Sequence, residues 1–386
     1  MNDMVQHAIF AHRVFTGTEM LADRFVTIEG ATIARISTSP PAGLAIAHLA
    51  EDAVLSPGFV DLQVNGGGGV LFNDQIDAAG LAQIAGAHRL AGTTTILPTL
   101  ISGSRDQLRA AMAVVAAVIR AGSSGIVGLH LEGPFLAPER RGIHPVKAMT
   151  GLTAADLDLL CSDFPGRLLI TLAPERAPVG AIARLANAGR IVFAGHTAAS
   201  FDQAVAALDA GMAGFTHLFN AMSPLATREP GAVGAALTDR RAQAGIILDG
   251  LHVHPAAARL ALSAMGPERL FLVSDAMPTA GADISAFHFD GRFITLRDGK
   301  LTDDTGTLAG AHLTLADAMA NAVRLLGCGL EDALRMATAT PAAVIGLGAR
   351  VGHIGTGYAA DMVALNAELR PFKVWASGQP MRPARS

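Results

Sequence analysis

The chain has few of the residues that stabilise small secreted domains or stack on nucleic-acid bases. Its 386 residues include two cysteines, Cys161 and Cys328, one tryptophan and one tyrosine. The two cysteines fall in separate predicted helical regions, so they form neither a disulfide framework nor a cysteine-based metal site. One tryptophan and one tyrosine cannot supply the aromatic platforms on which single strands stack. The composition therefore argues against both of these protein classes.

The sequence also lacks a basic excess and a long apolar segment. Lys and Arg number 29 against 33 Asp and Glu, a formal net charge of -4, which leaves no basic footprint for nucleic acid. The longest wholly apolar helical run, 110–119, is far too short to span a bilayer. The opening MNDMVQHAIF lacks the basic and apolar segments of a secretory signal. We therefore expect a soluble, cytoplasmic protein that binds neither membranes nor nucleic acid.

What the chain does have is a recurring pattern of short β-branched or aliphatic runs separated by helical stretches. A dinucleotide-binding fold would need G-x-G-x-x-G after the first run, and the glycines at 66–69 lack that spacing. Eight strands alternating with helices over this length predict an α/β fold of the TIM-like (β/α)8 barrel type. The eight runs are 60–64, 93–97, 126–130, 168–172, 191–193, 215–216, 244–248 and 270–273.

Both ends of the chain alternate apolar and polar residues in short segments instead, and a turn is expected at Gly30. We predict a small β-sandwich domain formed by 1–55 and 350–386, beside a hydrolase barrel domain of 56–349. Late in the barrel, 284–308 holds two alternating runs and is expected to form a hairpin. Two helices are expected after it.

Two of the predicted barrel strands each end in a histidine, His196 and His217. The residues between them, 201–210, have helical spacing, so the unit is a parallel crossover with both strand ends on one rim. Two imidazoles that face one point there suggest a metal site. Two histidines satisfied by loop hydrogen bonds are the alternative.

Carboxylates follow two further predicted strands. Glu132 ends strand three, and with His196 and His217 it completes a catalytic zinc pattern of three ligands and an open fourth position. Asp275 follows strand eight, where it could exchange a proton with water and with a departing amine. The alternatives are a structural ion pair for Glu132 and a helix N-cap for Asp275.

Other polar residues point to an anionic substrate. Asn220 and Ala221 follow His217 and could offer backbone amides to a phosphate, while the Arg228 guanidinium suits phosphate oxygens. Most surface arginines contact only water, so the presence of Arg228 does not by itself establish a phosphate-binding site. His144 could equally be an ordinary loop histidine.

A series of motifs supports one specific interpretation. In chain order they are PGFVDLQVNG, HLEGPFLAPERRGIHP, GHT, THLFNAMSPL, REPG, DGLHVHP and SDAMPTAG. Together they resemble the N-acetylglucosamine-6-phosphate deacetylase family of the amidohydrolase superfamily. The similarity extends from about Val54 to GTLAG at 306–310, and the small β domain also resembles that of the family.

The resemblance implies hydrolysis of N-acetylglucosamine 6-phosphate to glucosamine 6-phosphate and acetate, in amino-sugar catabolism or cell-wall recycling. It makes Glu132, His196 and His217 the ligands of one divalent metal ion per subunit, zinc or ferrous iron, and makes Asp275 the catalytic acid/base. The implied substrate-binding residues are Ile143, His144, Asn220, Ala221, Arg228, His252 and Leu308. The family's arginine reaches the neighbouring subunit's site, which implies a homodimer in which Arg228 does the same.

One departure concerns the metal count. Two-metal amidohydrolases have His-x-His at the end of strand one, where this chain has Gln63 and Asn65. Neutral amides are poor ligands beside imidazole, so we expect a vestigial outer-metal position and a mononuclear site. Two alternatives stay open: an amidohydrolase acting on a cyclic amide or nucleobase, and a non-catalytic sugar-phosphate-binding protein.

Overall fold

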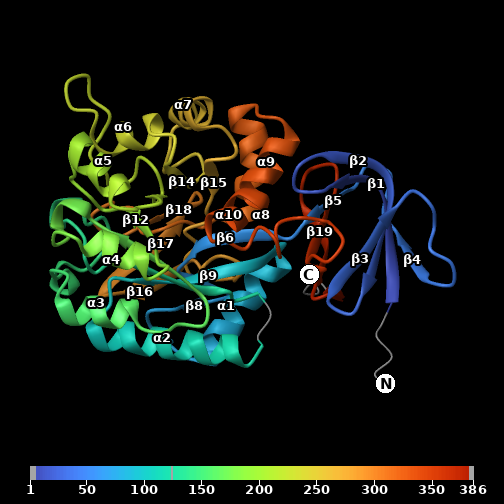
Figure 1. Ribbon diagram of the computed structural model, residues 1–386, viewed down its shortest axis with the longest axis horizontal. Helices are drawn as coiled ribbons and strands as arrows, with labels where there is room; N and C mark the ends of the chain where they lie inside the picture. The colour runs from blue at the N-terminus through green and yellow to red at the C-terminus, as the bar shows by residue number, and fades with distance from the viewer. Residues whose placement is uncertain (1–5, 123–124, 382–386) are drawn as a thin grey trace.

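The computed structural model describes residues 6–122 and 125–381, which form a barrel with a β-rich region beside it (Figure 1). Each of the eight apolar runs predicted from the sequence overlaps a barrel strand, and these strands pair in parallel in the order β15-β14-β13-β12-β11-β10-β9-β6. The predicted barrel fold is thus confirmed. The strands are β6 (Phe59–Val64), β9 (Thr93–Ile101), β10 (Gly128–Glu132), β11 (Arg167–Leu172), β12 (Ile191–Ala194), β13 (Gly214–Phe215), β14 (Gln243–Ile246) and β15 (Leu270–Leu272).

The barrel closes where its first and last strands meet. Val64 forms a parallel bridge with Ala276, just beyond β15. The backbone N–H of Asp275 also donates to the carbonyl of Gln63 at 3.0 Å. The carboxyl ends of β6 and β15 therefore lie side by side on the same rim, as ring closure requires.

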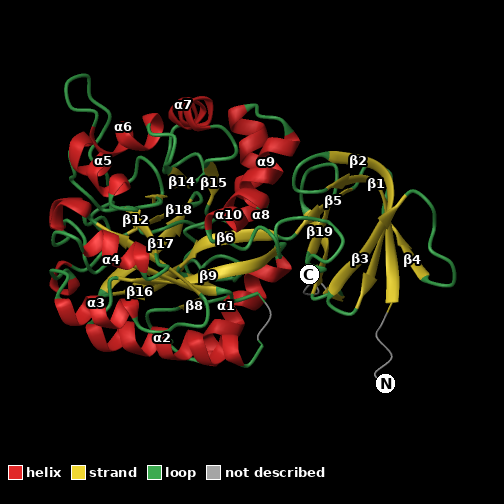
Figure 2. Ribbon diagram, viewed as in Figure 1, coloured by secondary structure: helices red, strands yellow, loops and turns green. Residues whose placement is uncertain are grey.

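Helices surround the strands (Figure 2). In α2, Ser104 and Gln107 form a capping box, and the buried Leu108, Ala111 and Val115 recur at helical spacing, so one face packs inward. The helices are α1 (Ala78–Leu90), α2 (Arg105–Arg120), α3 (Ala154–Cys161), α4 (Ala181–Asn187), α5 (Phe201–Asp209), α6 (Gly231–Thr238), α7 (Pro255–Met265), α8 (Leu315–Asn321), α9 (Leu330–Ala337) and α10 (Ala339–Val344). A π-helical turn, Ala322–Leu326, extends α8.

Strands from both ends of the chain form one sheet in the order β21-β20-β19-β5-β1-β2-β3, with β4 paired to β1. Backbone hydrogen bonds join Ile33 in β3 to Tyr358 and Gly357, so the far edge of the sheet bends back toward β19. The enclosed core includes Ile9 and Trp375. The strands are β1 (Gln6–Phe15), β2 (Met20–Glu29), β3 (Thr32–Ser37), β4 (Ala45–His48), β5 (Val54–Pro57), β19 (Met362–Leu365), β20 (Pro371–Ala376) and β21 (Gln379–Met381).

The structure therefore shows a separate β region built from both termini. The proposed boundaries, 1–55 with 350–386 against 56–349, stay a prediction, and their outermost residues, 1–5 and 382–386, lie outside the described part of the chain. Two short strands, β7 (Gly66–Gly67) and β8 (Val70–Leu71), complete the loop after β6.

The predicted hairpin after strand eight is wrong by one strand. The segment forms a three-stranded antiparallel sheet of β16 (Ala286–Phe289), β17 (Arg292–Arg297) and β18 (Lys300–Thr302). Each of its two turns is an Asp-Gly pair with both residues at positive φ, the geometry of tight two-residue hairpins. Phe289 and Ile294 of this sheet share a buried cluster with Ile101 and Ile143, so the insert packs against the barrel rim.

Candidate active site

Four predicted site residues stand at the carboxyl ends of barrel strands. Glu132 ends β10, His196 and His217 follow β12 and β13, and Asp275 follows β15. The last three adopt left-handed backbone conformations, with φ of 47°, 33° and 50°. Such conformations are unfavourable for non-glycine residues and gather at functional sites, where the surrounding fold imposes them. No helix begins at Asp275, so the helix N-cap alternative is wrong.

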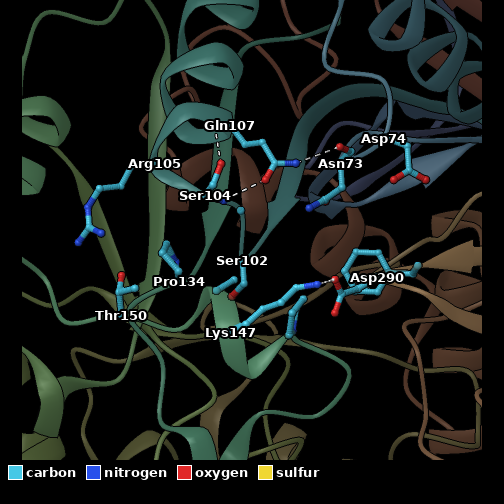
Figure 3. Close-up of a pocket in the computed structure, with 14 residues that line it drawn as sticks. Asn73, Asp74, Ser102, Ser104, Arg105, Gln107, Pro134, Lys147, Thr150 and Asp290 are labelled. Atoms are coloured by element: carbon cyan, nitrogen blue, oxygen red, sulfur yellow. Dashed lines mark hydrogen bonds and ion pairs between the residues drawn. The ribbon is translucent and has the colours of Figure 1, made fainter.

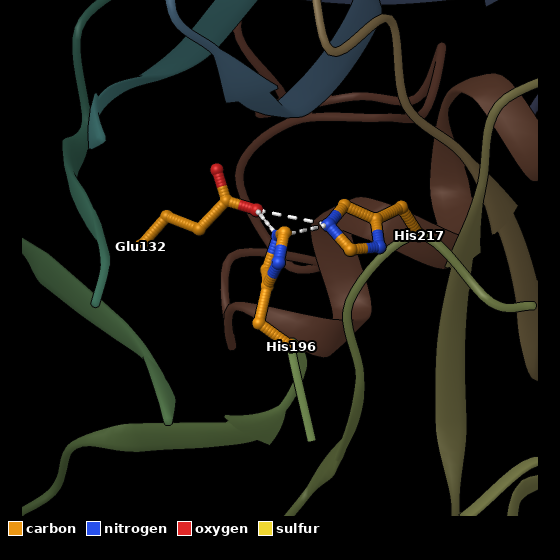
Figure 4. A group of neighbouring side chains, drawn as sticks. All are labelled: Glu132, His196 and His217. Carbon is orange, nitrogen blue, oxygen red and sulfur yellow. Dashed lines mark hydrogen bonds and ion pairs between the residues drawn. The ribbon is translucent and has the colours of Figure 1, made fainter. Parts of the chain in front are cut away.

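Glu132, His196 and His217 converge on one point (Figure 4). Oε1 of Glu132 lies 2.9 Å from Nε2 of His217 and 3.3 Å from Nε2 of His196. The two Nε2 atoms are 3.0 Å apart. All three residues are buried, so no bulk water competes for this focus.

The three side chains fit a small divalent cation. With zinc–ligand bonds of about 2.0 to 2.1 Å, neighbouring ligand atoms in a tetrahedral site lie about 3.3 Å apart, close to the separations seen here. Nδ1 of His196 lies 2.8 Å from the carbonyl oxygen of Arg140 and must donate to it. The proton is then on Nδ1, so Nε2 offers its lone pair to the focus, as metal-binding histidines do.

Asp275 lies beside this focus, joined to Glu132 by the side-chain amide of Gln63. Nε2 of Gln63 is 3.0 Å from Oε1 of Glu132 and 3.0 Å from Oδ1 of Asp275. Nδ2 of Asn65 donates to the same Asp275 oxygen at 2.7 Å. The amides thus direct N–H groups, which cannot ligate a metal, at the two carboxylates. This supports the prediction of a single metal ion, which stays a prediction.

Burial and charge set the proton affinities of the site. Burial acts to raise the pKa of Glu132, but hydrogen bonds with His196 and His217 outweigh it and hold that pKa well below its usual range. Burial acts to lower the pKa of His217, yet its contacts with Glu132 raise it. The cluster therefore attracts positive charge at the point where a cation would lie.

Asp275 has the opposite tendency. Burial, followed by the nearby charge of Glu132, raises the pKa of Asp275 to about 6. A carboxyl group with a pKa near neutrality can both accept and release a proton at physiological pH. His144, in contrast, is kept neutral because burial holds its pKa well below the usual value.

One cavity of about 220 Å³ contains nearly all of the predicted residues. Besides the metal cluster and Asp275, its lining includes Asn65 and six of the seven predicted substrate-binding residues: Ile143, His144, Asn220, Ala221, His252 and Leu308. Nδ1 of His252 is paired with Asp249 at 2.6 Å, which fixes the ring at the cavity wall. Gln63 does not line this cavity and acts on it through its hydrogen bonds.

Arg228 is the predicted substrate-binding residue that the single chain does not bring to the cavity. It lies in a fully exposed stretch, 224–229, within the loop that precedes α6 and extends away from the barrel (Figure 1). Its side chain makes no hydrogen bond or ion pair with the described residues. Its predicted action in a neighbouring subunit is compatible with this position and stays a prediction.

The sequence reasoning missed two rim residues that hold the site together. Ser102, after β9, has its Oγ 2.8 Å from Nδ1 of His144. Glu175, after β11, accepts from Thr197 Oγ1 at 2.5 Å and from the Ala198 N–H at 2.7 Å, which braces the loop beyond His196. Both residues follow barrel strands, so a search of the segments after strands two and four would have included them as candidates. Only their contacts with His144 and Thr197 show what they do.

Comparison with known sequences agrees with this geometry. Residues 54–381 match the amidohydrolase family. The chain is 43% identical to the N-acetylgalactosamine-6-phosphate deacetylase of Shewanella sp. (strain ANA-3), over 84% of this chain and 82% of that protein. It is 32% identical to the N-acetylglucosamine-6-phosphate deacetylase of Haemophilus influenzae, over 97% and 99%. None of the described helices has both the length and the apolar character needed to cross a bilayer.

Solved structures show the same relationship. N-acetylglucosamine-6-phosphate deacetylase from Pasteurella multocida superposes with a TM-score of 0.94 at 34% identity, covering 97% of this chain and 99% of that one. A mutant of the Mycobacterium smegmatis enzyme in complex with N-acetyl-D-glucosamine-6-phosphate gives 0.89 at 34% identity, with the same coverage. The family inferred from the motifs is thus confirmed. The chain belongs to the amidohydrolase family, within the group formed by the N-acetylglucosamine-6-phosphate and N-acetylgalactosamine-6-phosphate deacetylases.

Proposed function

We propose that this chain hydrolyses the acetamide of N-acetylglucosamine 6-phosphate, releasing acetate and glucosamine 6-phosphate, in amino-sugar catabolism or cell-wall recycling in the cytoplasm. The observation that carries the proposal is the buried cluster of Glu132, His196 and His217, with Asp275 bonded to the same amide as Glu132. A three-ligand metal centre beside a carboxyl group of raised pKa is suited to amide hydrolysis.

Glu132, His196 and His217 would hold one divalent cation, zinc or ferrous iron. When bound there, such a cation polarises the amide carbonyl and increases the acidity of water. Asp275 accepts the proton of the attacking water and returns it to the departing amine nitrogen. Gln63 and Asn65 orient the carboxylate for both transfers through their hydrogen bonds to Oδ1.

His144 lies beside the metal cluster in the same cavity. Its Nε2 is 3.9 Å from Oε2 of Glu132, and its ring centre is 4.2 Å from that of His196. From there it donates a hydrogen bond to the amide oxygen, where negative charge develops during attack. Ile143 and Leu308 contribute apolar walls to the same cavity.

Asn220, Ala221 and His252, which line the same cavity, bind the sugar phosphate in this proposal. Binding energy from the phosphate then orients the amide over the cluster. The phosphate site is completed by Arg228 of a second copy, so the working unit is a homodimer. Support for this comes from the exposed, unpaired position of Arg228 outside its own cavity.

N-acetylgalactosamine 6-phosphate is a second candidate substrate. The observation that favours it is the 43% identity to the Shewanella enzyme, against 32% to the Haemophilus one. The two sugars differ only in the configuration of the hydroxyl on C4, whereas the acetamide is on C2. The metal cluster and Asp275 therefore serve either substrate equally, and the discrimination must come from contacts with the sugar ring.

The test is acetate release by metal-loaded protein from both phosphorylated sugars, with the two unphosphorylated sugars alongside. We expect release from N-acetylglucosamine 6-phosphate and little from either unphosphorylated sugar. A clear preference for N-acetylgalactosamine 6-phosphate would make that sugar the substrate in place of N-acetylglucosamine 6-phosphate. Equal activity on unphosphorylated amides would favour another amidohydrolase reaction. No release from any of the four, with stoichiometric metal confirmed, would overturn the proposal.

A further inference from the structure

A contact between Ser102 and His144 separates the candidate active site from a second cavity. His144 lines the active-site cavity, whereas Ser102 lines a neighbouring cavity of about 430 Å³ (Figure 3). Ser102 Oγ lies 2.8 Å from Nδ1 of His144. Ser102 is 3% exposed and His144 is 2% exposed, so water does not compete for this hydrogen bond.

The direction of this hydrogen bond follows from the acceptors around the hydroxyl. Besides Nδ1 of His144, the Ser102 hydroxyl lies near the carbonyl oxygen of Glu132, at 3.4 Å. That distance exceeds the usual range for an O–H···O bond, about 2.5 to 3.0 Å. The same carbonyl already accepts the backbone N–H of Ser102 at 2.8 Å. The hydroxyl proton therefore goes to Nδ1 of His144.

A neutral imidazole carries one ring proton, so an Nδ1 that accepts leaves that proton on Nε2. Nε2 is the nitrogen that faces the metal cluster, 3.9 Å from Oε2 of Glu132. An N–H directed toward a carboxylate is attracted, whereas a lone pair in that place would be repelled. Both ends of the His144 ring therefore favour the same tautomer.

We infer that Ser102 is a positioning residue for the proposed deacetylation: its hydroxyl fixes His144 as the tautomer with the proton on Nε2, so that His144 donates to the amide oxygen. The inference rests on the proposed function for its catalytic consequence. The hydrogen bond itself stands on the geometry of the two side chains.

The fold holds Ser102 in place through the residues around the metal ligand Glu132. The backbone N–H of Ser102 is bonded to the Glu132 carbonyl, so the ends of β9 and β10 are tied at this point. The next residue, Gly133, has a φ of +85°, and a Cβ there would lie 2.4 Å from Ser102 Oγ. A side chain at 133 would therefore displace the hydroxyl. The glycine at position 133 therefore leaves the space that the Ser102 hydroxyl occupies at this rim.

A double-mutant cycle tests whether Ser102 acts through His144. We expect His144→Ala to lower kcat by about 100-fold, because it removes an oxyanion donor. Ser102→Ala should lower kcat by about tenfold with KM nearly unchanged, since a lost supporting hydrogen bond weakens its partner. In the His144→Ala background, Ser102→Ala should change kcat by less than about twofold. Losses that multiply would overturn the inference.

Ser104→Ala is the matched control for the cycle. Ser104 lines the same second cavity, but its Oγ caps α2 by accepting from the Gln107 N–H. Its loss should weaken the helix and leave kcat unchanged. A similar fall in kcat for Ser104→Ala and Ser102→Ala would mean that the effect is general loosening of the β9 end.

The tautomer can be read without turnover. In 15N-histidine NMR at neutral pH, the His144 signals, identified by their absence from His144→Ala, should show a protonated Nε2 and an unprotonated Nδ1. Ser102→Ala should shift them toward a mixture. A protonated Nδ1 in the intact protein would overturn the inference even if acetate is released. If the expected tautomer is found in a protein that releases no acetate, the Ser102–His144 hydrogen bond is correct and the proposed function is wrong.

Discussion

The two ends of the candidate active-site cavity differ in how completely one chain builds them. At the reacting end, the ligand atoms of Glu132, His196 and His217 lie within 4.8 Å of one another, buried among strand ends. At the end where we propose that the phosphate binds, Asn220 lines the cavity while Arg228 lies outside it on an exposed loop. The barrel of one chain thus brings the proposed metal ligands together, whereas the charge that would recognise the phosphate depends on a second copy in our proposal.

The largest effect is expected from removing a proposed metal ligand at the reacting end of the cavity. We expect His196→Ala to lose both bound metal and acetate release, because it removes one of three ligands from a buried site. The measurement is metal content by mass spectrometry together with turnover. His254→Ala is the matched control, since His254 caps α7 from an exposed position outside the cavity. Full metal content and activity in His196→Ala would contradict the assigned cluster.

The next effect separates proton transfer from metal binding at the same end. Asp275→Asn keeps an oxygen for Asn65 and Gln63 but cannot exchange a proton, so kcat should fall by about 10²- to 10⁴-fold. Metal content and substrate affinity should remain close to those of the unaltered protein. Turnover within a few fold of normal would remove Asp275 from the role of acid/base.

A smaller effect is expected at the phosphate end. Arg228→Ala should raise KM for the phosphorylated sugar by about 10- to 100-fold, because charge-assisted hydrogen bonds contribute about 1.5 to 3 kcal/mol. Activity on the unphosphorylated sugar should not change. Arg176→Ala is a suitable control, because Arg176, at the end of a 3-10 helix after β11, is also exposed and does not line the cavity. An unchanged KM would contradict the proposed contact between Arg228 and the phosphate.

Mixing two defective subunits sharpens this comparison further. If Arg228 acts in the neighbouring site, a heterodimer of Asp275→Asn and Arg228→Ala subunits contains one intact site. That site combines Asp275 of one subunit with Arg228 of the other. Mixing should therefore restore normal KM in part of the population, whereas an arginine acting within its own chain would give no recovery.

The smallest effect lies outside both ends. Arg105 holds Asp156 at 2.7 and 2.9 Å. Burial acts to raise the pKa of Asp156, but the bonds with Arg105 and Thr153 lower it to about 2, from 3.8 in the unfolded chain. Because the folded pKa is depressed, the stabilisation is complete above about pH 4 and is lost as the pH falls toward 2.

Asp156→Asn should therefore reduce the free energy of unfolding by about 1 to 2 kcal/mol at pH 7, a value discounted because Arg105 is partly exposed. The difference from the unaltered protein should shrink between pH 4 and pH 3, while kcat at pH 7 stays unchanged. Urea unfolding at these pH values is the measurement. A difference that stays constant with pH would show that the ion pair is not its source.

Sequence reasoning succeeded where a residue's position follows from chain topology. Parallel strands of a barrel present their carboxyl ends on one rim, so Glu132, His196, His217 and Asp275 could be placed together from their positions after apolar runs. Neither the distances nor the left-handed backbone at three of these residues was predictable, because both depend on loops packed from elsewhere in the chain.

Sequence reasoning failed where a role depends on contact between distant loops. Ser102 and Glu175 carry no motif, and their importance appears only when His144 and Thr197 are seen beside them. The insert was a different kind of error. Its two Asp-Gly turns are a recognisable signal for three strands, but the last strand, Lys300–Thr302, is too short to show a clear alternation.

The closure of the barrel between β6 and the residues after β15 has a consequence for when the folding chain becomes active. Gln63 and Asp275 are 212 positions apart, yet their backbones form a closing hydrogen bond of the barrel and their side chains form part of the site. Formation of the last strand contact and placement of the acid/base are therefore a single event. We expect a folding chain to stay inactive until the residues after β15 reach β6, because Asp275 is not in place before then. In refolding experiments, the return of acetate release should follow the slow joining of these distant segments, behind the recovery of helical signal.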